Sequence, residues 1–381
     1  MKKFFYGSHF IDKKDKIAVL NSLDHTLSQG PILKKFENDV AKMFGAKYCV
    51  ATSSATAALH ITIKALNLKK NSLAYTSDMT FVATTNACLY NNLKINLVDI
   101  NLDNFNLKID DLEKKLSKKD KKKKLILPVH FGGLPCNMKK IYKIAKKYNC
   151  FVIEDASQAM GAKYYNKHIG SCKFSDAAIF SLHPVKSITS GEGGLVLTND
   201  KNLADKVKLL RSHGIFKDKK VYWKNNMISL GYNYKITDFQ CALGLSQLKK
   251  LKTFISKRHK IAKHYIKILS EAGVTFQIPS SSQNYYSAYH YFIILFKKKI
   301  TDKTQKKFLF DLAKKGIYLG KQYKPVHKHS FYKKIINEKY PNSERYYSQG
   351  FQLPLNPNLK NKEINLICNK IIDAIKRFKL K

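Results

Sequence analysis

The chain has 381 residues, 44% of them hydrophobic and 12% aromatic, with 70 basic residues against 27 acidic ones and a formal net charge of +43. This length exceeds that of a usual single domain, and the composition excludes a disordered or fibrous protein, so we expect one large and one smaller globular domain. The start, MKKFFYGSHF, lacks the apolar core of a signal peptide, and no later stretch is long enough to span a bilayer, which predicts a cytoplasmic protein with no membrane partner.

In the first part of the chain, short apolar runs alternate with helical patterns. Apolar residues recur at helical spacing between Pro31 and Gly45, which predicts an amphipathic helix that opens with proline and closes with glycine. A lysine run at 118–124, interrupted only by Asp120, predicts a solvated loop. Strands are predicted at residues 48–51, 73–76, 95–99, 125–130 and 150–155. Such alternation is typical of an α/β domain whose largely parallel sheet is wrapped by helices.

The pattern changes after residue 155. Residues 177–182 and 194–198 are predicted strands, and the loop between them, which holds Lys186, is too short for a crossover helix. A long helical pattern then runs from Asp238 to Arg258 and could connect the large domain to a smaller one. The rest is typical of an α+β domain, with a strand at 289–296. We therefore predict a large domain over residues 1–245 and a small C-terminal domain over residues 246–381.

The segment from Ser53 to Leu59 places small hydroxyl residues between a predicted strand and a helical run. Backbone amides at a helix start, together with Ser and Thr hydroxyls, form a natural seat for a phosphate group. The same residue types are also ordinary helix caps. On this segment alone, the two interpretations are equally supported.

Two further segments carry groups suited to covalent chemistry. Asp155 ends the strand at 150–155, at the edge where open α/β sheets bind ligands, and its carboxylate could pair with a protonated ring nitrogen. Lys186 lies between a strand and the glycine-rich turn Gly191-Glu192-Gly193-Gly194, where partial desolvation would lower its pKa toward Schiff-base chemistry. Taken singly, Asp155 could be a helix cap, and Lys186 is one lysine among many.

In this order, the three segments resemble the DegT-type family of sugar aminotransferases, which belongs to the fold type I, aspartate aminotransferase-like superfamily of pyridoxal phosphate enzymes. The resemblance spans nearly the whole chain. It rests also on Gln29-Gly30-Pro31, on the TFVAT segment at 80–84 and on the GYNYKITD segment at 231–238. A mostly parallel large domain and a smaller α+β domain are what this resemblance implies.

The resemblance also implies roles for individual residues around pyridoxal 5'-phosphate. Lys186 would carry the cofactor as a Schiff base and, once released, would act as the base that moves the substrate proton. Asp155 would bind the pyridine nitrogen, Phe81 would stack on the ring, and Gln158 would lie near the phenolic oxygen. For Phe81, a place in the hydrophobic core is the competing interpretation.

The cofactor phosphate would be held from two subunits. Within one chain, the resemblance assigns the phosphate to a set of small residues, namely Ser54, Ala55, Thr56 and Ser181. Asn233 is expected to reach the phosphate of the neighbouring subunit. The active unit implied is therefore a homodimer with shared active sites.

Within this family, the segment from Ser181 to Gly194 is most similar to members that aminate C4 of a UDP-linked 4-keto-6-deoxy-N-acetylhexosamine in pseudaminic acid synthesis. The implied partners are this nucleotide-linked keto-sugar and an amino acid donor, glutamate by family analogy. Two residues depart from the pattern. Ser187 stands where proline is common, and Gln322 stands where histidine is usual, and both are near residues expected to touch the sugar.

Several alternatives stay open at this stage. The acceptor could be a GDP-linked 4-keto sugar, as in perosamine synthesis, or a 3-keto sugar, whereas a dehydratase of this fold would lack the Schiff-base lysine. The net charge of +43 also suggests a fold type I regulator that binds nucleic acid, but no DNA- or RNA-binding motif appears and no nucleic-acid partner is expected. The seven cysteines are scattered and not spaced as paired metal ligands, so no metal is expected.

Overall fold

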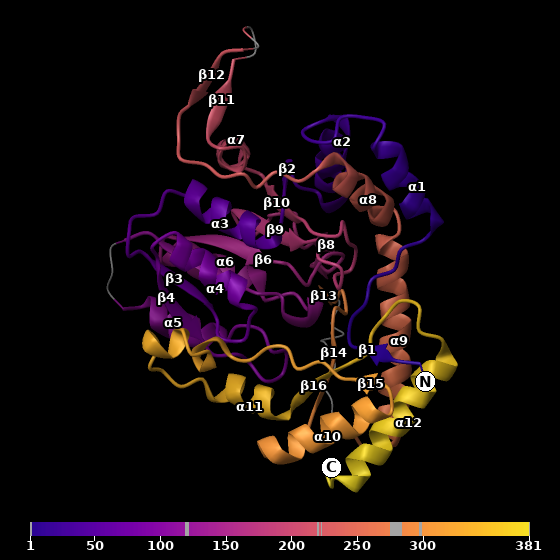
Figure 1. Ribbon diagram of the computed structural model, residues 1–381. Helices are drawn as coiled ribbons and strands as arrows, with labels where there is room; N and C mark the ends of the chain where they lie inside the picture. The colour runs from indigo at the N-terminus through magenta and orange to yellow at the C-terminus, as the bar shows by residue number, and fades with distance from the viewer. Residues whose placement is uncertain are drawn as a thin grey trace.

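A computed structural model describes residues 2–118, 122–218, 221, 223–274, 284–296 and 299–380. These residues form a large body around a seven-stranded sheet and a smaller body that holds both chain ends (Figure 1). Of the lysine run predicted as a loop, residues 119–121 lie outside the described residues, and Lys124 already belongs to a strand.

The large sheet has the strand order β2-β10-β9-β6-β5-β3-β4, and β10 is antiparallel to both of its neighbours, whereas the other pairs are parallel. The short loop between β9 and β10 requires this reversal. All the strands predicted in this region are confirmed, with small shifts at their ends: β2 (Tyr48–Thr52), β3 (Leu73–Ser77), β4 (Lys94–Val98), β5 (Lys124–Leu127), β6 (Cys150–Asp155), β9 (Ala177–Ser181) and β10 (Gly194–Thr198).

Helices cover both faces of this sheet because its strands are apolar on both sides. In β6, Val152 packs into one hydrophobic cluster and Ile153 into the other. The Ile153 side is covered by α3 (Ala55–Ala65), α4 (Val82–Tyr90) and α7 (Lys201–Arg211). The Val152 side is covered by α2 (Pro31–Phe44), α5 (Ile109–Leu116), α6 (Met138–Lys147) and α8 (Asp238–Leu248), and α1 (Lys13–Ser22) packs on α8.

The smaller body combines short strand pairs with helices, as the α+β prediction requires. Its strand pairs are β1 (Phe4–Phe5) with β15 (Ile317–Tyr318), which are parallel, and β14 (Phe292–Leu295) with β16 (Gly350–Leu353), which are antiparallel. Residues of α10 (Asp302–Lys314) and α12 (Asn361–Arg377) close this core. The helix α11 (Pro341–Gln349) contacts β16, whereas the short 3-10 helices at Val326–Lys328 and Tyr332–Lys334 pack against β4 and α4 of the large body.

The long helical pattern predicted from Asp238 into Arg258 is two helices in the structure, α8 and α9 (Leu251–Glu271). The break falls at Lys250, whose Nζ lies 2.7 Å from carboxylate oxygens of both Asp12 and Asp15 at the start of α1. The first turns of α9 pack in the large core and its later turns in the small one, so α9 links the two bodies. The domain limits at 245 and 246 stay a prediction.

Three small features complete the fold. A sheet of β7 (Lys163–Tyr164), β8 (Lys167–His168) and β13 (Tyr285–Tyr286) joins the two halves of the chain. A 3-10 turn spans Phe131–Gly133. The hairpin of β11 (Ile215–Lys217) and β12 (Asn225–Met227) projects from the body at the top of Figure 1.

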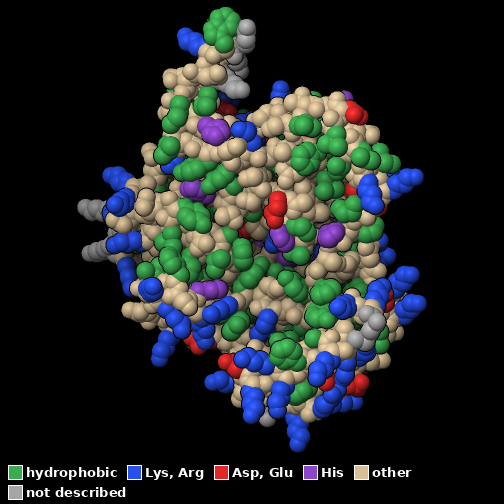
Figure 2. Space-filling model, viewed as in Figure 1, with side chains coloured by type: hydrophobic (Ala, Val, Ile, Leu, Met, Phe, Trp, Pro, Cys, Tyr) green, Lys and Arg blue, Asp and Glu red, His purple; other side chains and the backbone are tan. Residues whose placement is uncertain are grey.

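The surface carries the positive charge unevenly. Figure 2 shows Lys and Arg side chains gathered over the lower part of the molecule, where α10, α11 and α12 lie in Figure 1, and fewer at the centre of this face. Among the described residues, no helix combines the length and the apolar character that crossing a bilayer requires.

Candidate active site

A cavity of about 700 Å³ opens at the carboxyl ends of the parallel strands. This volume lies within the range of small-molecule sites, at the sheet edge where α/β proteins bind ligands. The structure brings together at this cavity every site residue predicted from the sequence except Asn233, that is Ser54, Ala55, Thr56, Phe81, Asp155, Gln158, Ser181 and Lys186.

One end of the cavity is the start of α3. Ser54 is the N-cap of this helix, and its Oγ accepts a hydrogen bond of 3.1 Å from the Ala57 amide, which leaves its hydroxyl hydrogen free to donate. The amides of Ala55 and Thr56 belong to the first turn, where a helix offers no internal acceptor. A Cβ atom at Gly194 would lie 2.6 Å from the Ala55 nitrogen, so only glycine lets β10 pass this close. Such a helix start can bind an anion.

The carboxylate of Asp155 is buried at the end of β6 and is held by two neighbours. Thr84 Oγ1 donates to Asp155 Oδ2 at 2.6 Å, and the Ser157 amide donates to Oδ1 at 3.1 Å. Because Thr84 gives its only hydroxyl hydrogen to the carboxylate, the contact of 2.8 Å between Thr80 and Thr84 has Thr80 as the donor. The TFVAT segment at 80–84 was a mark of the resemblance, but nothing in its pattern linked Thr80 and Thr84 to Asp155.

Lys186 is half-buried in the loop after β9, and it lines the same cavity as Asp155. Its loop is tightened by hydrogen bonds from the Lys186 amide to the His183 carbonyl, at 2.9 Å, and from Thr189 Oγ1 to the Leu182 carbonyl, at 2.8 Å. Burial lowers the pKa of the Lys186 amine from 10.5 to about 8, although the charges of Asp155 and then Glu192 act in the opposite direction. About a tenth of this amine is therefore neutral, and thus nucleophilic, at pH 7, far more than for an exposed lysine.

This lowered pKa predicts how Lys186 reacts with aldehydes in the cofactor-free protein. The rate of adduct formation with pyridoxal should rise with pH through about 8 and level off above about pH 9, because the neutral amine is the nucleophile. Borohydride reduction followed by peptide mass spectrometry gives the rate at each lysine. Exposed lysines, with an ordinary pKa of about 10.4, serve as the internal control, and a Lys186 midpoint at that value would contradict the prediction.

Gln158 and Tyr323 link the large body to the smaller one across the cavity. Gln158 Oε1 accepts the Gly132 amide at 2.7 Å, and its Nε2 donates to the Tyr323 hydroxyl at 3.3 Å. That hydroxyl also lies 3.1 Å from the hydroxyl of Tyr291. Burial raises the pKa of Tyr323 to about 12, so the phenol stays protonated.

Phe81 is the N-cap of α4, and 54% of its surface is exposed at the cavity. Its ring centroid lies 5.6 Å from that of Tyr323. The position excludes the competing interpretation of Phe81 as a core aromatic and leaves its ring available for stacking on a ligand.

Several residues of this cavity were absent from the predicted site. They include His183 and Glu192 from the loop between β9 and β10, and Tyr6, Tyr291 and Tyr323 from the side of the smaller body. Gln322, noted from the sequence only as a departure near the sugar, also lines the cavity. The available signals were the segment at 181–194, which holds His183 and Glu192, and the aromatic and amide residues at 320–327, which include Tyr323.

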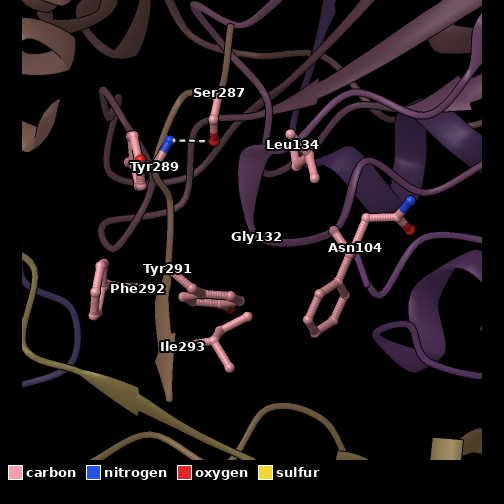
Figure 3. A pocket seen from close by; sticks show the side chains of 9 residues that line it. Asn104, Gly132, Leu134, Ser287, Tyr289, Tyr291, Phe292 and Ile293 are labelled. Carbon is pink, nitrogen blue, oxygen red and sulfur yellow. Dashed lines mark hydrogen bonds between the residues drawn. The ribbon is translucent and has the colours of Figure 1, made fainter. Parts of the chain in front are cut away.

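The wall behind Tyr291 is made by two segments that are distant in the sequence. Figure 3 shows the stretch from Ser287 to Ile293 beside the loop of Gly132, with the ring of Tyr291 between them. The His290 amide donates to the Gly132 carbonyl at 2.9 Å, and the Tyr289 amide donates to Ser287 Oγ at 3.0 Å. Only about 20 Å³ of free space remains there, so this wall is well packed.

Asn233 does not line the cavity. It is exposed and forms an isolated bridge with Ser212, near the projecting β11–β12 hairpin. Its expected contact with a neighbouring subunit stays a prediction.

The donor set of the cavity suits a phosphorylated aldehyde better than a metal ion. No group of three or more His, Cys, Asp or Glu side chains placed to hold a metal occurs in the part of the chain that the structure describes. An amine, a buried carboxylate and an open helix start face one cavity, which permits covalent attachment, charge pairing and phosphate binding in a single ligand.

Comparison with known proteins gives a consistent set of relatives. Residues 10–372 match the DegT/DnrJ/EryC1/StrS aminotransferase family. The chain is 37% identical to the UDP-4-amino-4,6-dideoxy-N-acetyl-beta-L-altrosamine transaminase of Campylobacter jejuni over 98% of both chains, and 33% identical to the GDP-perosamine synthase of Escherichia coli O157:H7 over 94% of both. Among solved structures, it is similar to Helicobacter pylori PseC, an aminotransferase involved in the biosynthesis of pseudoaminic acid, with a TM-score of 0.90, 30% identity and coverage of 99% and 100% of the two chains.

Proposed function

This chain belongs to the DegT/DnrJ/EryC1/StrS aminotransferase family and has the fold of the type I pyridoxal phosphate enzymes, and we propose a specific reaction for it. In this reaction, the enzyme aminates C4 of a UDP-linked 4-keto-6-deoxy-N-acetylhexosamine. Glutamate is the proposed amino donor. The observation that carries the proposal is that Lys186 and Asp155 line one cavity with the start of α3. The identity of 37% with a transaminase acting on such a UDP-sugar supports the choice of substrate.

The residues present fit pyridoxal 5'-phosphate. When bound, this cofactor would supply an aldehyde that joins amines and a ring that spreads the electron pair released when a C–H bond breaks. The amides of Ala55 and Thr56, with the hydroxyls of Ser54 and Ser181, are donors for its phosphate. Phe81 offers a ring face for stacking.

In the proposed reaction, Lys186 moves protons and Asp155 holds one. The pKa of the Lys186 amine, about 8, leaves it able to take a proton from the substrate Cα and to return it, on the same face, at the other reacting carbon. The carboxylate of Asp155, fixed by Thr84 and Ser157, keeps a proton on the ring nitrogen by charge pairing. Gln158 and Tyr323 orient the polar edge of the bound group.

The test is a panel of acceptors offered to the purified holoenzyme after it has been treated with glutamate. We expect the UDP-linked 4-keto-6-deoxy-N-acetylhexosamine to restore the absorbance spectrum of the untreated enzyme and to yield an amino-sugar detectable by mass spectrometry. If none of the UDP-linked keto-sugars in the panel is converted, the proposed substrate is wrong.

A GDP-linked 4-keto sugar is the second candidate acceptor. It is favoured by the 33% identity with a GDP-perosamine synthase over 94% of both chains. The same panel decides between the two acceptors. If the GDP-linked sugar is converted faster than the UDP-linked one, the GDP-linked sugar is the acceptor.

We further propose that the active unit is a homodimer in which Asn233 serves the neighbouring site. The region around Asn233 carries several exposed apolar side chains, which suits a subunit contact, namely Phe216, Trp223, Met227, Ile228 and Leu230. In a dimer with shared sites, each cavity would take Lys186 from one chain and Asn233 from the other.

Mixing two inactive variants tests this arrangement. Lys186→Ala and Asn233→Asp homodimers should each be nearly inactive, the second because a carboxylate would repel the cofactor phosphate. After denaturation and joint refolding, mixed dimers should regain activity, since one of their two cavities has both native residues. Each variant refolded alone is the control. Absence of recovery in verified mixed dimers would place Asn233 within its own chain's site or outside it.

A further inference from the structure

The cavity wall formed by Gln322 and Tyr323 comes from the smaller body and lies outside its regular strands. β15 ends at Tyr318, after only two residues paired with β1. Beyond it, Gly320 forms an isolated bridge with Gln352 of β16 through two backbone hydrogen bonds, of 2.8 and 3.0 Å. The chain then leaves the backbone of β16 and runs into the cavity.

At this point the side chain of Gln352 takes over the pairing. Its Oε1 accepts the Gln322 amide at 2.9 Å, and its Nε2 donates to the Gln322 carbonyl at 2.6 Å. A glutamine amide has the same donor and acceptor as a peptide group, so it pairs with Gln322 as a neighbouring strand would. Meanwhile the backbone of Gln352 continues in register with Ile293 of β14.

The oxygen and both hydrogens of the Gln352 side-chain amide form hydrogen bonds. Gln352 is fully buried, and the second hydrogen of its Nε2 goes to the Tyr346 hydroxyl at 2.6 Å. Tyr346 in turn donates to the Gln322 carbonyl at 3.0 Å. A Cβ atom at Gly320 would lie 2.7 Å from Gln352 Oε1, so the approach of the two segments also depends on glycine.

The segment that Gln352 holds carries Gln322 and Tyr323, which line the cavity. Tyr323 contacts Gln158 at 3.3 Å and lies beside Phe81, and both of these residues belong to the large body. Gln322 and Tyr323 therefore complete the cavity lining next to Phe81 and Gln158. A displacement of this wall by even about 1 Å is enough to misalign a bound substrate.

We propose that Gln352 is a positioning residue that acts through Gln322 and Tyr323 to shape the acceptor side of the cavity, an inference that rests on the proposed function. A nucleotide-linked sugar is larger than an amino acid donor, so it contacts more of this wall. Gln352 should therefore matter more for the sugar than for the donor, although it touches neither.

The test compares Gln352→Leu with the wild-type holoenzyme. Loss of the paired amide should raise KM for the keto-sugar by about tenfold or more, because several buried hydrogen bonds are lost together. The rate of the spectral change with glutamate alone and the affinity for the cofactor should change less than about twofold. Equal losses with donor and sugar, together with a lower melting temperature, would show a merely structural role and overturn the proposal.

Gln305→Leu is the matched control. Gln305 is a glutamine of the same body whose Nε2 also donates to backbone carbonyls, at 3.0 Å for Ser348 and 3.4 Å for Tyr347, but it does not line the cavity. It should leave KM for the sugar unchanged. If KM for the sugar rose as much in Gln305→Leu as in Gln352→Leu, the proposed action of Gln352 through the cavity wall would be wrong.

A second variant, Gln352→Glu, keeps the shape of the side chain and the acceptor for the Gln322 amide. As a carboxylate it has no hydrogen for the Gln322 carbonyl, whereas as a neutral acid it has one. Burial should raise the pKa of this new group, so KM relative to wild type at the same pH should improve as pH falls. A ratio that does not vary with pH would contradict the proposed role.

The crystal structure of Gln352→Leu separates this inference from the proposed function. A shift of Gln322 and Tyr323 supports the positioning role whether or not the wild-type enzyme converts a UDP-linked sugar. An unchanged wall overturns it. By contrast, a wild-type enzyme that converts no sugar in the panel contradicts only the proposed substrate.

Discussion

Lys186→Ala is expected to reduce the turnover of the holoenzyme by about 10³-fold or more. Two functions are lost together, because the same amine attaches the cofactor and moves the proton. The buried position and the pKa of about 8 make this amine suited to both tasks. The measurement is the steady-state rate with glutamate and the keto-sugar, combined with the visible absorbance of the cofactor joined to lysine, which should disappear.

Chemical rescue distinguishes the loss of a base from a damaged fold. Added methylamine should restore part of the activity of Lys186→Ala, because the vacated space admits a small amine. Lys186→Arg, which keeps the charge and fills the space, should be inactive and should not respond. Lys324→Ala, at an exposed lysine that follows Tyr323, should behave as wild type. Full turnover of Lys186→Ala without added amine would remove the basis of the proposed mechanism.

The part of the site that lies on the sheet was predictable from the sequence. Asp155 ends a strand, Ser54 and Lys186 follow strands, and parallel strands place their carboxyl ends at one edge of the sheet. The positions of the strands therefore predict that these three residues meet at one cavity. The roles assigned to these residues came from the resemblance to a family, since a helix cap or a single lysine has no specific meaning alone.

The wall from the smaller body was not predictable in the same way. Tyr323 meets Gln158 across 165 residues of sequence, and Gln352 holds Gln322 through a side chain rather than a strand. No periodic pattern encodes contacts of this kind, because each depends on how two bodies pack. The break between α8 and α9 was also missed, and the ion pairs that Lys250 forms there, with Asp12 and Asp15 more than 200 residues earlier, are contacts that a local helical pattern cannot reveal.

Asp155→Ala is the second variant for which we expect a large loss, of about 10²-fold or more in kcat with both substrates. Without the carboxylate, the ring nitrogen of the cofactor loses the negative partner that keeps it protonated. The ring then withdraws electrons from the substrate less strongly. A cofactor analogue methylated at that nitrogen carries the charge permanently. It should restore much of the rate in Asp155→Ala, where the shortened side chain leaves room for the methyl group, and it should not improve the wild type.

Thr84→Val calibrates this result, because it removes only the hydroxyl that donates to Asp155 at 2.6 Å and keeps the shape of the side chain. One hydrogen bond to a charged group contributes about 1.5–3 kcal/mol, so cofactor affinity should fall by about tenfold or more, measured by fluorescence titration. Thr84→Ser, which keeps the hydroxyl, should bind the cofactor nearly as wild type does. If the methylated analogue failed to rescue Asp155→Ala while Thr84→Val bound the cofactor normally, the carboxylate would be a packing element of β6, and the charge pairing on which the proposed chemistry depends would be wrong.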